Sequence, residues 1–345
     1  MENTKVTDFE KVTDFNVLYK AYKRACAGKG SVNSKQKFNI AALDGIYQIK
    51  RRIETKSYEV GSYNSFKIYE PKERLVTAGT FVDKIVQHAI CDSILHPKLQ
   101  KEFIQTNYAG QINKGTDYGL DCLKAQMYLA YCKYGYDCWI VKADIKKYFY
   151  SIDHEILKDI VQYFVDDKDF YWLVEKFIDS TEGIGVPLGN QISQVFALMY
   201  LSGLDHFVTG ELGVKYYGRY MDDIYLLVES KEYAKFCLES ICQFTESLNI
   251  ELNGKTQIIP FKNGLKFCGF HTYVTKDGKI IRKLTNEKKR AKRKKYIKMS
   301  KLLKNNKISK NDFEQSYNSF RNHISKGNCI KFGFSLDKMI KNIIQ

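Results

Sequence analysis

Two adjacent carboxylates, Asp222 and Asp223, stand in the segment "GRYMDDIYLL" between two runs of aromatic and aliphatic residues. Such runs on either side of a short polar pair predict a β-hairpin with the acids at its turn. Neighbouring carboxylates repel each other and lose hydration when they are covered. A divalent cation would offset both costs, because Mg²⁺ prefers carboxylate oxygens. The pair therefore indicates a metal site, and an ordinary Asp-rich turn stays open as the alternative.

A third carboxylate, Asp144, lies near the end of the apolar run "DCWIVKADI" at 137–145, which predicts a central strand. If this strand pairs with the hairpin, Asp144 and Asp222 can clamp two metal ions about 3.5–4 Å apart. In such sites one ion activates an attacking hydroxyl and the other neutralises a leaving phosphate. The three acids together predict phosphoryl-transfer chemistry.

Helices precede and surround this strand. Asp153 is a suitable N-cap for a helix that begins at "HEILKDIVQYF", with Ile152 and Leu157 as a hydrophobic staple. The periodicity of the chain up to this point predicts a mainly helical stretch at 1–60, a strand pair at 62–80, a helix at 81–99 and a helix after "NKGTDYGL".

The second half of the chain follows the same mixed pattern. Residues 186–208 predict a glycine turn and then a helix that is apolar nearly all round, and so buried. An amphipathic helix is predicted from "EYAKFCLESICQFTESL", followed by two short strands, "TQIIPF" and "LKFCGFHTY". Helices packed on an antiparallel sheet make an α+β fold.

Positive charge is concentrated at the end of the sequence. The formal net charge is +16, and residues 284–345 hold seventeen Lys or Arg against four Asp or Glu. Four of these lysines, Lys288, Lys292, Lys295 and Lys298, follow helical spacing. Charges packed so closely repel each other unless a polyanion neutralises them, which favours nucleic acid as the partner. A solvated helix face is the alternative.

Other features narrow the class of protein. The N-terminus "MENTKVTDFE" has no apolar signal region, and no run of residues approaches a membrane span. The nine cysteines are scattered and lack the spacing of structural zinc sites. We therefore expect a cytoplasmic protein with reduced thiols and no membrane partner.

Several motifs occur in the order found in reverse transcriptases. Tyr220-Met221-Asp222-Asp223 resembles their Tyr-x-Asp-Asp motif, and "VKADIKKYFYSIDHEIL" is similar to their first palm motif. The resemblance continues in "GVPLGNQISQ", in "LNGKTQIIP" with its lysine Lys255, and in "GLKFCGF", which resembles the primer-contacting hairpin. "YEPKERLVTAGTFVDKIVQHAI" resembles the fingers of group II intron-like enzymes. The likeness runs from about residue 65 to 280, and the chain is thereby similar to bacterial reverse transcriptases.

This resemblance implies a right-hand polymerase fold. The expected parts are a helical N-terminal extension at 1–62, fingers at 63–136, a palm at 137–283 with fingers helices interleaved, and a basic helical thumb at 284–345. No nuclease, RNase H or maturase-like extension is expected. The implied reaction is RNA-directed DNA synthesis, in which a primer 3′-hydroxyl attacks the α-phosphate of a dNTP.

The resemblance also implies roles for single residues. Asp144 and Asp222 would ligate two Mg²⁺ ions, for which Mn²⁺ can substitute, with Asp223 close by. Lys255 would neutralise or protonate the departing pyrophosphate, and a solvated turn lysine is its alternative. The thumb would bind the template–primer backbone through Lys288, Lys292, Arg293, Lys294, Lys295 and Lys298.

Five further residues would bind the incoming dNTP. Lys72 and Arg74 would hold its triphosphate, Phe149 would exclude a 2′-hydroxyl, and Leu188 with Gly189 would lie near the nascent base pair. The alternatives are exposed strand charges for the first two, a core phenylalanine for Phe149 and simple packing for Leu188.

One departure refines the resemblance. The usual Gln-Gly-x-x-x-Ser-Pro is Leu188-Gly189…Ser193-Gln194 here, which resembles enzymes of diversity-generating retroelements and of defence-associated, anti-phage lineages. Such enzymes copy a dedicated structured non-coding RNA from a DNA or RNA primer, with an accessory protein or as homo-oligomers. Two other functions stay open: a template-independent or protein-primed DNA synthesiser, and a non-catalytic RNA-binding scaffold.

Overall fold

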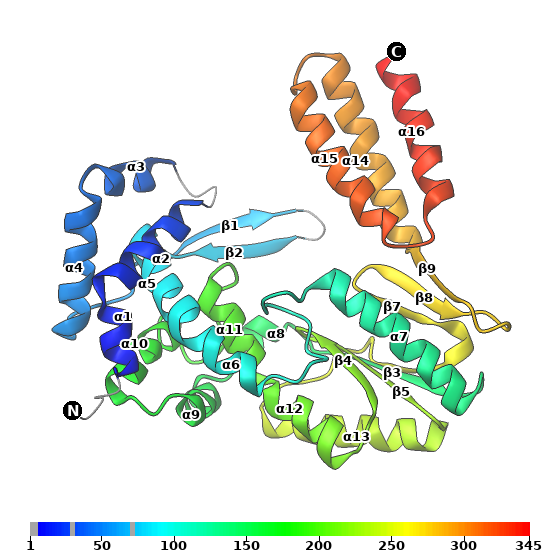
Figure 1. The fold of residues 1–345 in the computed structure, drawn as a ribbon, viewed down its shortest axis with the longest axis horizontal. Coiled ribbons are helices and arrows are strands. Elements are labelled where there is room, and N and C mark those ends of the chain that lie inside the picture. The colour runs from blue at the N-terminus through cyan, green and yellow to red at the C-terminus, as the bar shows by residue number, and fades with distance from the viewer. Residues whose placement is uncertain (1–5, 28–31, 70–72) are drawn as a thin grey trace. The chain divides into compact units, whose positions relative to one another are not determined.

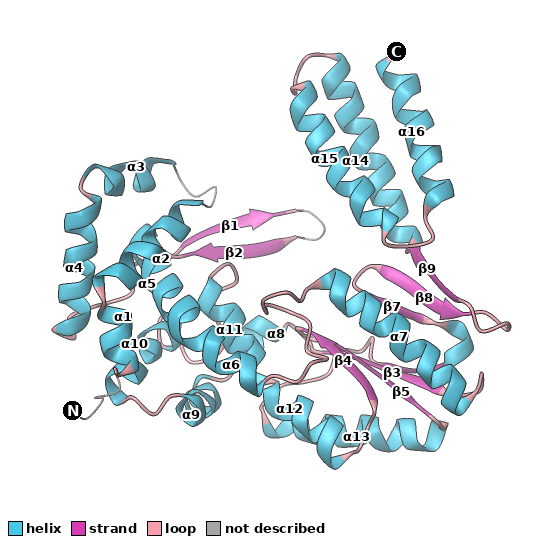
Figure 2. Cartoon of the chain, viewed as in Figure 1, coloured by secondary structure: helices cyan, strands magenta, loops and turns pink. Residues whose placement is uncertain are grey.

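The computed structural model describes residues 6–27, 32–69 and 73–345 of the chain (Figure 1). It divides into two compact units, each built from three chain segments. Unit 1 comprises residues 1–112, 145–211 and 240–254, and unit 2 comprises residues 113–144, 212–239 and 255–345. Helices dominate both, and the strands form three small antiparallel sheets (Figure 2). The α+β class expected from the sequence is therefore confirmed.

Unit 1 begins with helices, as predicted for residues 1–60. These are α1 (Asp8–Thr13), α2 (Phe15–Ala27), α3 (Val32–Ile40) and α4 (Ala42–Glu54). Helix α2 packs against α4 and against α5 (Phe81–Ile90). Leu18, Ile46 and Val86 are all fully buried in these helices. The N-terminal helices thus share one core with the first helix that follows the predicted strand pair.

The predicted strand pair is the hairpin of β1 (Asn64–Ile68) and β2 (Arg74–Ala78). Its junction with α5 is fixed by Asp83, a buried carboxylate at the start of that helix. Asp83 accepts hydrogen bonds from the Tyr58 hydroxyl at 2.7 Å and from the Thr80 amide at 3.0 Å, and Thr80 caps the helix in return. A buried charge that is bonded in this way sets the direction in which β2 enters the helix.

The helix predicted at 81–99 is present but changes its winding. Helix α5 is followed by a π-helical turn, Cys91–Leu95, and then by α6 (His96–Glu102) with Pro97 in its first turn. Because proline has no amide hydrogen to donate, the regular bonding pattern cannot continue through this position. The sequence pattern identified the helix and missed the change in winding.

The other helices of unit 1 include α11 (Gln191–Tyr200), the helix that was predicted to be buried. The predicted N-cap Asp153 begins α9 (His154–Phe164), where it accepts from the amides of Glu155 at 3.0 Å and Ile156 at 3.3 Å. Ile152 and Leu157, predicted as a hydrophobic staple, are both fully buried. The helices are α8 (Tyr148–Ser151), α9 (His154–Phe164), α10 (Lys168–Ile178), α11 (Gln191–Tyr200) and α12 (Ser202–His206). Helix α10 was not predicted, although its N-cap Asp167 is a recognisable start signal.

Unit 2 contains the four-stranded antiparallel sheet in the order β4-β5-β3-β6. Its strands are β3 (Trp139–Asp144), β4 (Tyr216–Tyr220), β5 (Asp223–Val228) and β6 (Gln257–Pro260). Helix α7 (Thr116–Tyr134) contacts β4 and β5. The amphipathic helix predicted after β5 is α13 (Lys231–Ser247), and its Ala234, Cys237 and Ile241 are fully buried.

A second sheet of unit 2 differs from the prediction. The residue pattern predicted the segment "LKFCGFHTY" as one strand, but it is a hairpin of β7 (Leu265–Phe267) and β8 (Phe270–Val274), as the resemblance of "GLKFCGF" to a hairpin implied. The two turn residues, Cys268 and Gly269, have φ of +46° and +84°. Both values match the tight hairpin turn that Asn-Gly usually forms, and cysteine in the first position hides that signal. Strand β9 (Ile280–Leu284), also not predicted, completes this sheet.

The C-terminal segment forms the predicted basic helix and two more helices. They are α14 (Asn286–Lys304), α15 (Lys310–Ser325) and α16 (Ile330–Ile344), and α14 contacts both of the others. The buried Tyr296 packs edge-on against Phe313 and Tyr317. The loop between α15 and α16 is held on β9, where Arg282 and Asn328 exchange backbone and side-chain hydrogen bonds. In the part of the chain that the structure describes, no helix is long and apolar enough to cross a membrane.

Candidate active site

Two of the predicted carboxylates meet on one face of the four-stranded sheet, and the third is next to them in the chain. Asp223 at the start of β5 lies directly opposite Asp144 on β3 and opposite Tyr220 on β4. Residues that are paired across antiparallel strands share a face, so Tyr220, Asp223 and Asp144 form one row. Asp222 precedes this row immediately, in the turn between β4 and β5. The expected pairing of the strand 137–145 with the hairpin is therefore confirmed.

The turn that holds Asp222 has only two residues, Met221 and Asp222. Met221 has φ of +55°, which an unbranched L-residue adopts at a cost in free energy. Arg219, fully buried, donates from its guanidinium to the Met221 carbonyl at 3.1 Å and so braces the turn. A strained backbone conformation persists only where neighbouring groups hold it in place. Here the Met221 conformation determines the position of Asp222.

Lys142 forms an ion pair with Asp223 on this face of the sheet. It stands two residues before Asp144 on the same side of β3, and its Nζ donates to Asp223 Oδ1 at 2.8 Å. The same ammonium donates to the Lys266 carbonyl of β7 at 2.6 Å. Burial raises the pKa of Asp223, Lys142 opposes that rise and the neighbouring Asp144 adds to it. Asp223 is thus a partly buried acid with its own counter-ion.

The turn between β7 and β8 lies beside these acids. Burial raises the pKa of the Cys268 thiol to about 12, and the negative charge of Asp223 contributes to the rise. A thiol with so high a pKa stays protonated and is a poor nucleophile. Lys288 of α14 donates to the Cys268 carbonyl at 3.4 Å, and burial lowers the pKa of this lysine. Lys288 thus holds the turn at the Cys268 carbonyl, and Lys142 holds the adjoining strand β7 at the Lys266 carbonyl.

The donor set suits hard divalent cations. Asp144 and Asp222 offer carboxylate oxygens, and Mg²⁺ commonly needs only one or two protein carboxylates when phosphate oxygens and water complete its shell. Across the described ranges, no three His, Cys, Asp or Glu side chains are already gathered into a ligand cluster. Asp223 is bonded to Lys142 beside them, and the assignment of the metals to Asp144 and Asp222 stays a prediction.

Lys255 lies just before β6, at the same edge of the sheet as these acids. It is exposed, and the next residue, Thr256, accepts a hydrogen bond from the Asp144 amide at 3.4 Å. The chain therefore brings Lys255 near the end of β3 that bears Asp144, which suits the predicted contact with pyrophosphate.

The predicted dNTP-binding residues are placed within unit 1. Arg74 is exposed at the start of β2, and Lys72 lies outside the described residues. The Thr77 amide of β2 donates to the Leu188 carbonyl at 2.7 Å, so the Leu188-Gly189 turn is fixed beside this strand. Gly189 has φ of +128°, and a Cβ there would lie 2.8 Å from Val76 Cγ1. Only glycine fits this close approach.

Phe149 lies in the short helix α8. Its side chain is half-buried, whereas the neighbouring Tyr148 is fully buried and meets it edge-on with ring centroids 5.9 Å apart. The Phe149 carbonyl accepts from the Val186 amide at 2.7 Å, which ties α8 to the segment that precedes Leu188. Tyr148, rather than Phe149, serves as the core aromatic residue of this helix.

Some basic residues of α14 contact the helical bundle and others are exposed. Lys292, Arg293 and Lys295 each lie 5.3–5.9 Å from an aromatic ring of the C-terminal helices, so part of each side chain covers the bundle itself. Lys294 and Lys298 are exposed. The helix therefore presents a charged surface, and its contact with nucleic acid stays a prediction.

Comparison with known proteins identifies the family. The pattern described as "Reverse transcriptase (RNA-dependent DNA polymerase)" matches residues 68–272, which is more than half of the chain. The chain belongs to the reverse transcriptase family. The match includes all three carboxylates, strand β7 and the first part of β8.

Two curated relatives indicate the type of reverse transcriptase. The chain is 26% identical over 229 residues to the COX1/OXI3 intron 2 protein of Saccharomyces cerevisiae, covering 60% of this chain and 25% of that protein. It is 25% identical over 210 residues to the group II intron-encoded protein LtrA of Lactococcus lactis subsp. cremoris, covering 56% and 33%. These matches confirm a reverse transcriptase of the group II intron-like type, and they span a quarter to a third of each relative's length.

A solved structure shares the fold. Telomerase from Candida albicans, solved in complex with a fragment of telomeric RNA, matches with a TM-score of 0.51 at 11% sequence identity. The match covers 73% of this reverse transcriptase and 50% of that chain. The expected right-hand polymerase fold is thereby confirmed.

Three residues of the reverse transcriptase site were missed by sequence reasoning. They are Lys142, Arg219 and Cys268. The sequence could have placed Lys142 at the site, because residues two positions apart on a strand share a face and Lys142 stands two positions before Asp144. No local pattern indicates that Arg219 is buried, and only the resemblance of "GLKFCGF" to a hairpin pointed to a turn at Cys268.

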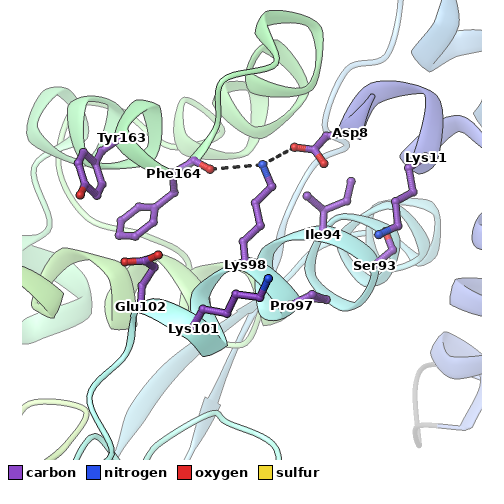
Figure 3. Close-up of a pocket in the computed structure, with 10 residues that line it drawn as sticks. All are labelled: Asp8, Lys11, Ser93, Ile94, Pro97, Lys98, Lys101, Glu102, Tyr163 and Phe164. Carbon is purple, nitrogen blue, oxygen red and sulfur yellow. Dashed lines mark hydrogen bonds and ion pairs between the residues drawn. The ribbon is translucent and has the colours of Figure 1, made fainter. Parts of the chain in front are cut away.

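A pocket of about 600 Å³ lies elsewhere in unit 1, between α1, α6 and the end of α9 (Figure 3). Lys98 crosses it and binds Asp8 Oδ2 at 2.5 Å and the Phe164 carbonyl at 3.5 Å. Its described lining includes none of the predicted site residues of the reverse transcriptase. The Lys98 contacts join α1, α6 and α9, so the polar groups in this pocket serve to hold these helices together.

Proposed function

We propose that this protein is an RNA-directed DNA polymerase that copies a structured RNA into DNA. The observation that supports this most directly is the row of Asp223 and Asp144, with Asp222 held beside it on a strained turn, in a chain of the reverse transcriptase family. Three carboxylates on one edge of a sheet are costly unless they serve a cation. Metal binding would explain why the chain has three acids at this place despite their repulsion.

In this proposal Asp144 and Asp222 hold two Mg²⁺ ions, with Mn²⁺ as a substitute. The bound ions would supply the Lewis acidity needed at the primer 3′-hydroxyl and at the phosphates. Arg74, together with Lys72, binds the triphosphate of the dNTP by charge-assisted hydrogen bonds. Lys255 neutralises or protonates the departing pyrophosphate. The protein mainly positions the reactants, as in other phosphoryl transfers.

Phe149 and Leu188 would select the substrate. The half-buried ring of Phe149 is proposed to lie against the sugar, where it leaves no room for a 2′-hydroxyl. Leu188 and Gly189 are proposed to lie beside the nascent base pair. The backbone of this turn is fixed by the Thr77 hydrogen bond, so the Leu188 side chain can act from a constant position.

The remaining parts would handle the nucleic acid. We infer a helical extension at 1–62, fingers at 63–136, a palm at 137–283 and a thumb at 284–345. The thumb would bind the template–primer backbone through the α14 residues Lys288, Lys292, Arg293, Lys294, Lys295 and Lys298. Such contacts position the duplex and carry no sequence information.

The biological setting is also a proposal. The Leu188-Gly189…Ser193-Gln194 pattern favours a cytoplasmic bacterial enzyme of a retroelement or an anti-phage defence system. Its template would be a dedicated structured non-coding RNA, and an accessory protein or a second copy of the chain would complete the assembly. The RNA that copurifies with the protein would identify the template.

The deciding experiment measures dNTP incorporation with Mg²⁺, with and without an RNA template, followed by sequencing of the product. We expect a DNA product complementary to the RNA. A product that is the same with and without RNA would show template-independent or protein-primed synthesis. RNA binding with no incorporation in either Mg²⁺ or Mn²⁺ would show a non-catalytic scaffold.

A further inference from the structure

We propose that Lys142 is a resident counter-ion of the carboxylate site, and that it couples this site to the β7–β8 hairpin. In this role it is a positioning residue, because it contacts Asp223 and the Lys266 carbonyl rather than the reacting atoms. The effect of Lys142 on metal binding rests on the proposed two-metal function. The contacts themselves, in which one ammonium group donates to acceptors on two strands, can be tested separately.

The contacts of Lys142 leave its ammonium little freedom. Two acceptors lie at 2.8 Å and 2.6 Å, and the side chain is only 17% exposed. Lysines that bind nucleic acid phosphates generally extend into solvent, so this one is not placed for that task. Charge-assisted bonds at such short distances in a partly buried site are among the stronger contacts a lysine makes.

The other charged groups around this pair favour the same role. Asp144 lies opposite Asp223 on the neighbouring strand and repels it, and the Cys268 thiol near Asp223 carries no charge of its own. Lys288 contacts the far side of the Cys268 turn. Lys142 is therefore a cation bonded to Asp223, and it offsets part of the repulsion between Asp223 and Asp144 before any metal binds.

The second contact of Lys142 reaches the other sheet. The Lys266 carbonyl belongs to β7, and the next residue, Phe267, packs edge-on against Tyr225 with ring centroids 5.0 Å apart. Tyr225 is opposite Lys142 in the sheet register. One ammonium and one aromatic pair thus hold β7 over the face that bears the acids. Loss of Lys142 should loosen the β7–β8 hairpin and leave the repulsion between Asp144 and Asp223 without a counter-charge.

The test compares the parent with Lys142→Met and Lys142→Arg. Without metal, Lys142→Met should lower Tm by roughly 5 °C or more, because it leaves the partly buried Asp223 without this counter-ion. Lys142→Arg keeps the charge and should lie close to the parent. Lys279→Met, which removes an exposed lysine of the β8–β9 turn paired with Asp277, is the matched control and should leave Tm unchanged.

A second readout is Mn²⁺ binding, followed by the electron paramagnetic resonance signal of free Mn²⁺. Removal of a neighbouring positive charge changes proton affinity by about 10- to 1000-fold. We therefore expect Lys142→Met to bind Mn²⁺ about tenfold more tightly or better, and Lys142→Arg to bind like the parent. Unchanged or weaker binding by a folded Lys142→Met protein would overturn the counter-ion role.

The double variant Lys142→Met/Asp223→Asn separates this inference from the proposed function. If Lys142 serves Asp223, the second substitution should restore much of the lost Tm. Strictly additive losses would refute the pairing, whatever the metal does. If instead neither the parent nor Asp144→Asn binds Mn²⁺, the two-metal function fails, and the Tm comparison still decides the role of Lys142.

Discussion

Gly218 of β4 lies directly opposite Tyr225 of β5, and the Tyr225 ring lies over it. A Cβ at Gly218 would lie 2.5 Å from the ring, a distance that real side chains do not tolerate. The ring is fully buried and meets Phe267 edge-on, so it has little room to move away. The glycine before the Tyr-x-Asp-Asp motif is therefore a packing requirement of this sheet face.

From this relationship we predict that Gly218→Ala destabilises the protein by about 1–3 kcal/mol, because it overpacks a filled core. Thermal unfolding would measure the loss. Gly254→Ala is the matched control, since a Cβ at Gly254 would meet nothing within 4 Å. Equal Tm values for the two variants would show that Tyr225 moves aside at no cost, and that it does not fix β7 over the sheet.

The carboxylates give the second prediction. Asp222→Asn, or Asp144→Asn, should leave the protein folded and abolish DNA synthesis in Mg²⁺. Each change removes a metal ligand while it also relieves repulsion, so Tm without metal should be unchanged or slightly higher. Incorporation assays and thermal unfolding on the same preparations would decide. Synthesis at a near-parental rate by either variant would contradict the two-metal assignment.

The sequence predicted the carboxylate site well because its geometry depends on strand periodicity. Asp144 at the end of one apolar strand and Asp223 at the start of another must meet once those strands pair. Lys142 could have been included by the same rule, since it shares the face of Asp144. The pairing that brings Asp144 and Asp223 together is thus largely determined by local patterns, which a single sequence contains.

Other parts of the site depend on contacts that local patterns do not contain. Cys268 adopts φ of +46° although cysteine has no preference for it, because the strands β7 and β8 on either side require a two-residue turn. Arg219 is fully buried in a position that its charge would assign to the surface. Both choices are set by the packing of distant segments, which overrides the tendency of the single residue.

The third prediction concerns the thumb. Lys294 and Lys298 are exposed on α14, whereas Lys292 and Arg293 lie over aromatic rings. Replacing Lys294 and Lys298 with Gln should weaken RNA binding about equally for unrelated sequences and reduce the salt slope of log K by about 1–2. Replacing Lys292, Arg293, Lys294 and Lys295 together should reduce it further, with some loss of Tm from the cation–π contacts. An unchanged slope in both variants would show that α14 does not face the nucleic acid.

The fourth prediction concerns the sugar. Phe149→Ala should raise the incorporation of ribonucleotides relative to deoxyribonucleotides, because it opens space where a 2′-hydroxyl would lie. A core phenylalanine would instead cost roughly 3–5 kcal/mol of stability without changing sugar preference. Since Phe149 is only half-buried, we expect the smaller stability loss and the larger change in preference. Paired measurements of Tm and of the two incorporation rates separate the explanations.

The last prediction concerns Leu188, where related enzymes usually have Gln. Its side chain is half-buried, although Val186 and Ile192 on either side are buried, and its carbonyl is bonded to Thr77. Leucine can pack against a base pair and cannot form a hydrogen bond. A mispaired geometry therefore loses less against Leu188 than it would against glutamine.

One such hydrogen bond is worth about 0.5–1.5 kcal/mol, or a several-fold change in discrimination between correct and incorrect nucleotides. Leu188→Gln and Leu188→Asn should accordingly lower misincorporation while they keep activity. Leu188→Met, which keeps an apolar side chain of similar volume, is the control and should keep the parental error rate. The measurement is the error spectrum of each enzyme on one RNA template. If the spectra of parent and Leu188→Gln are identical at equal activity, Leu188 only fills space beside Val186 and Ile192.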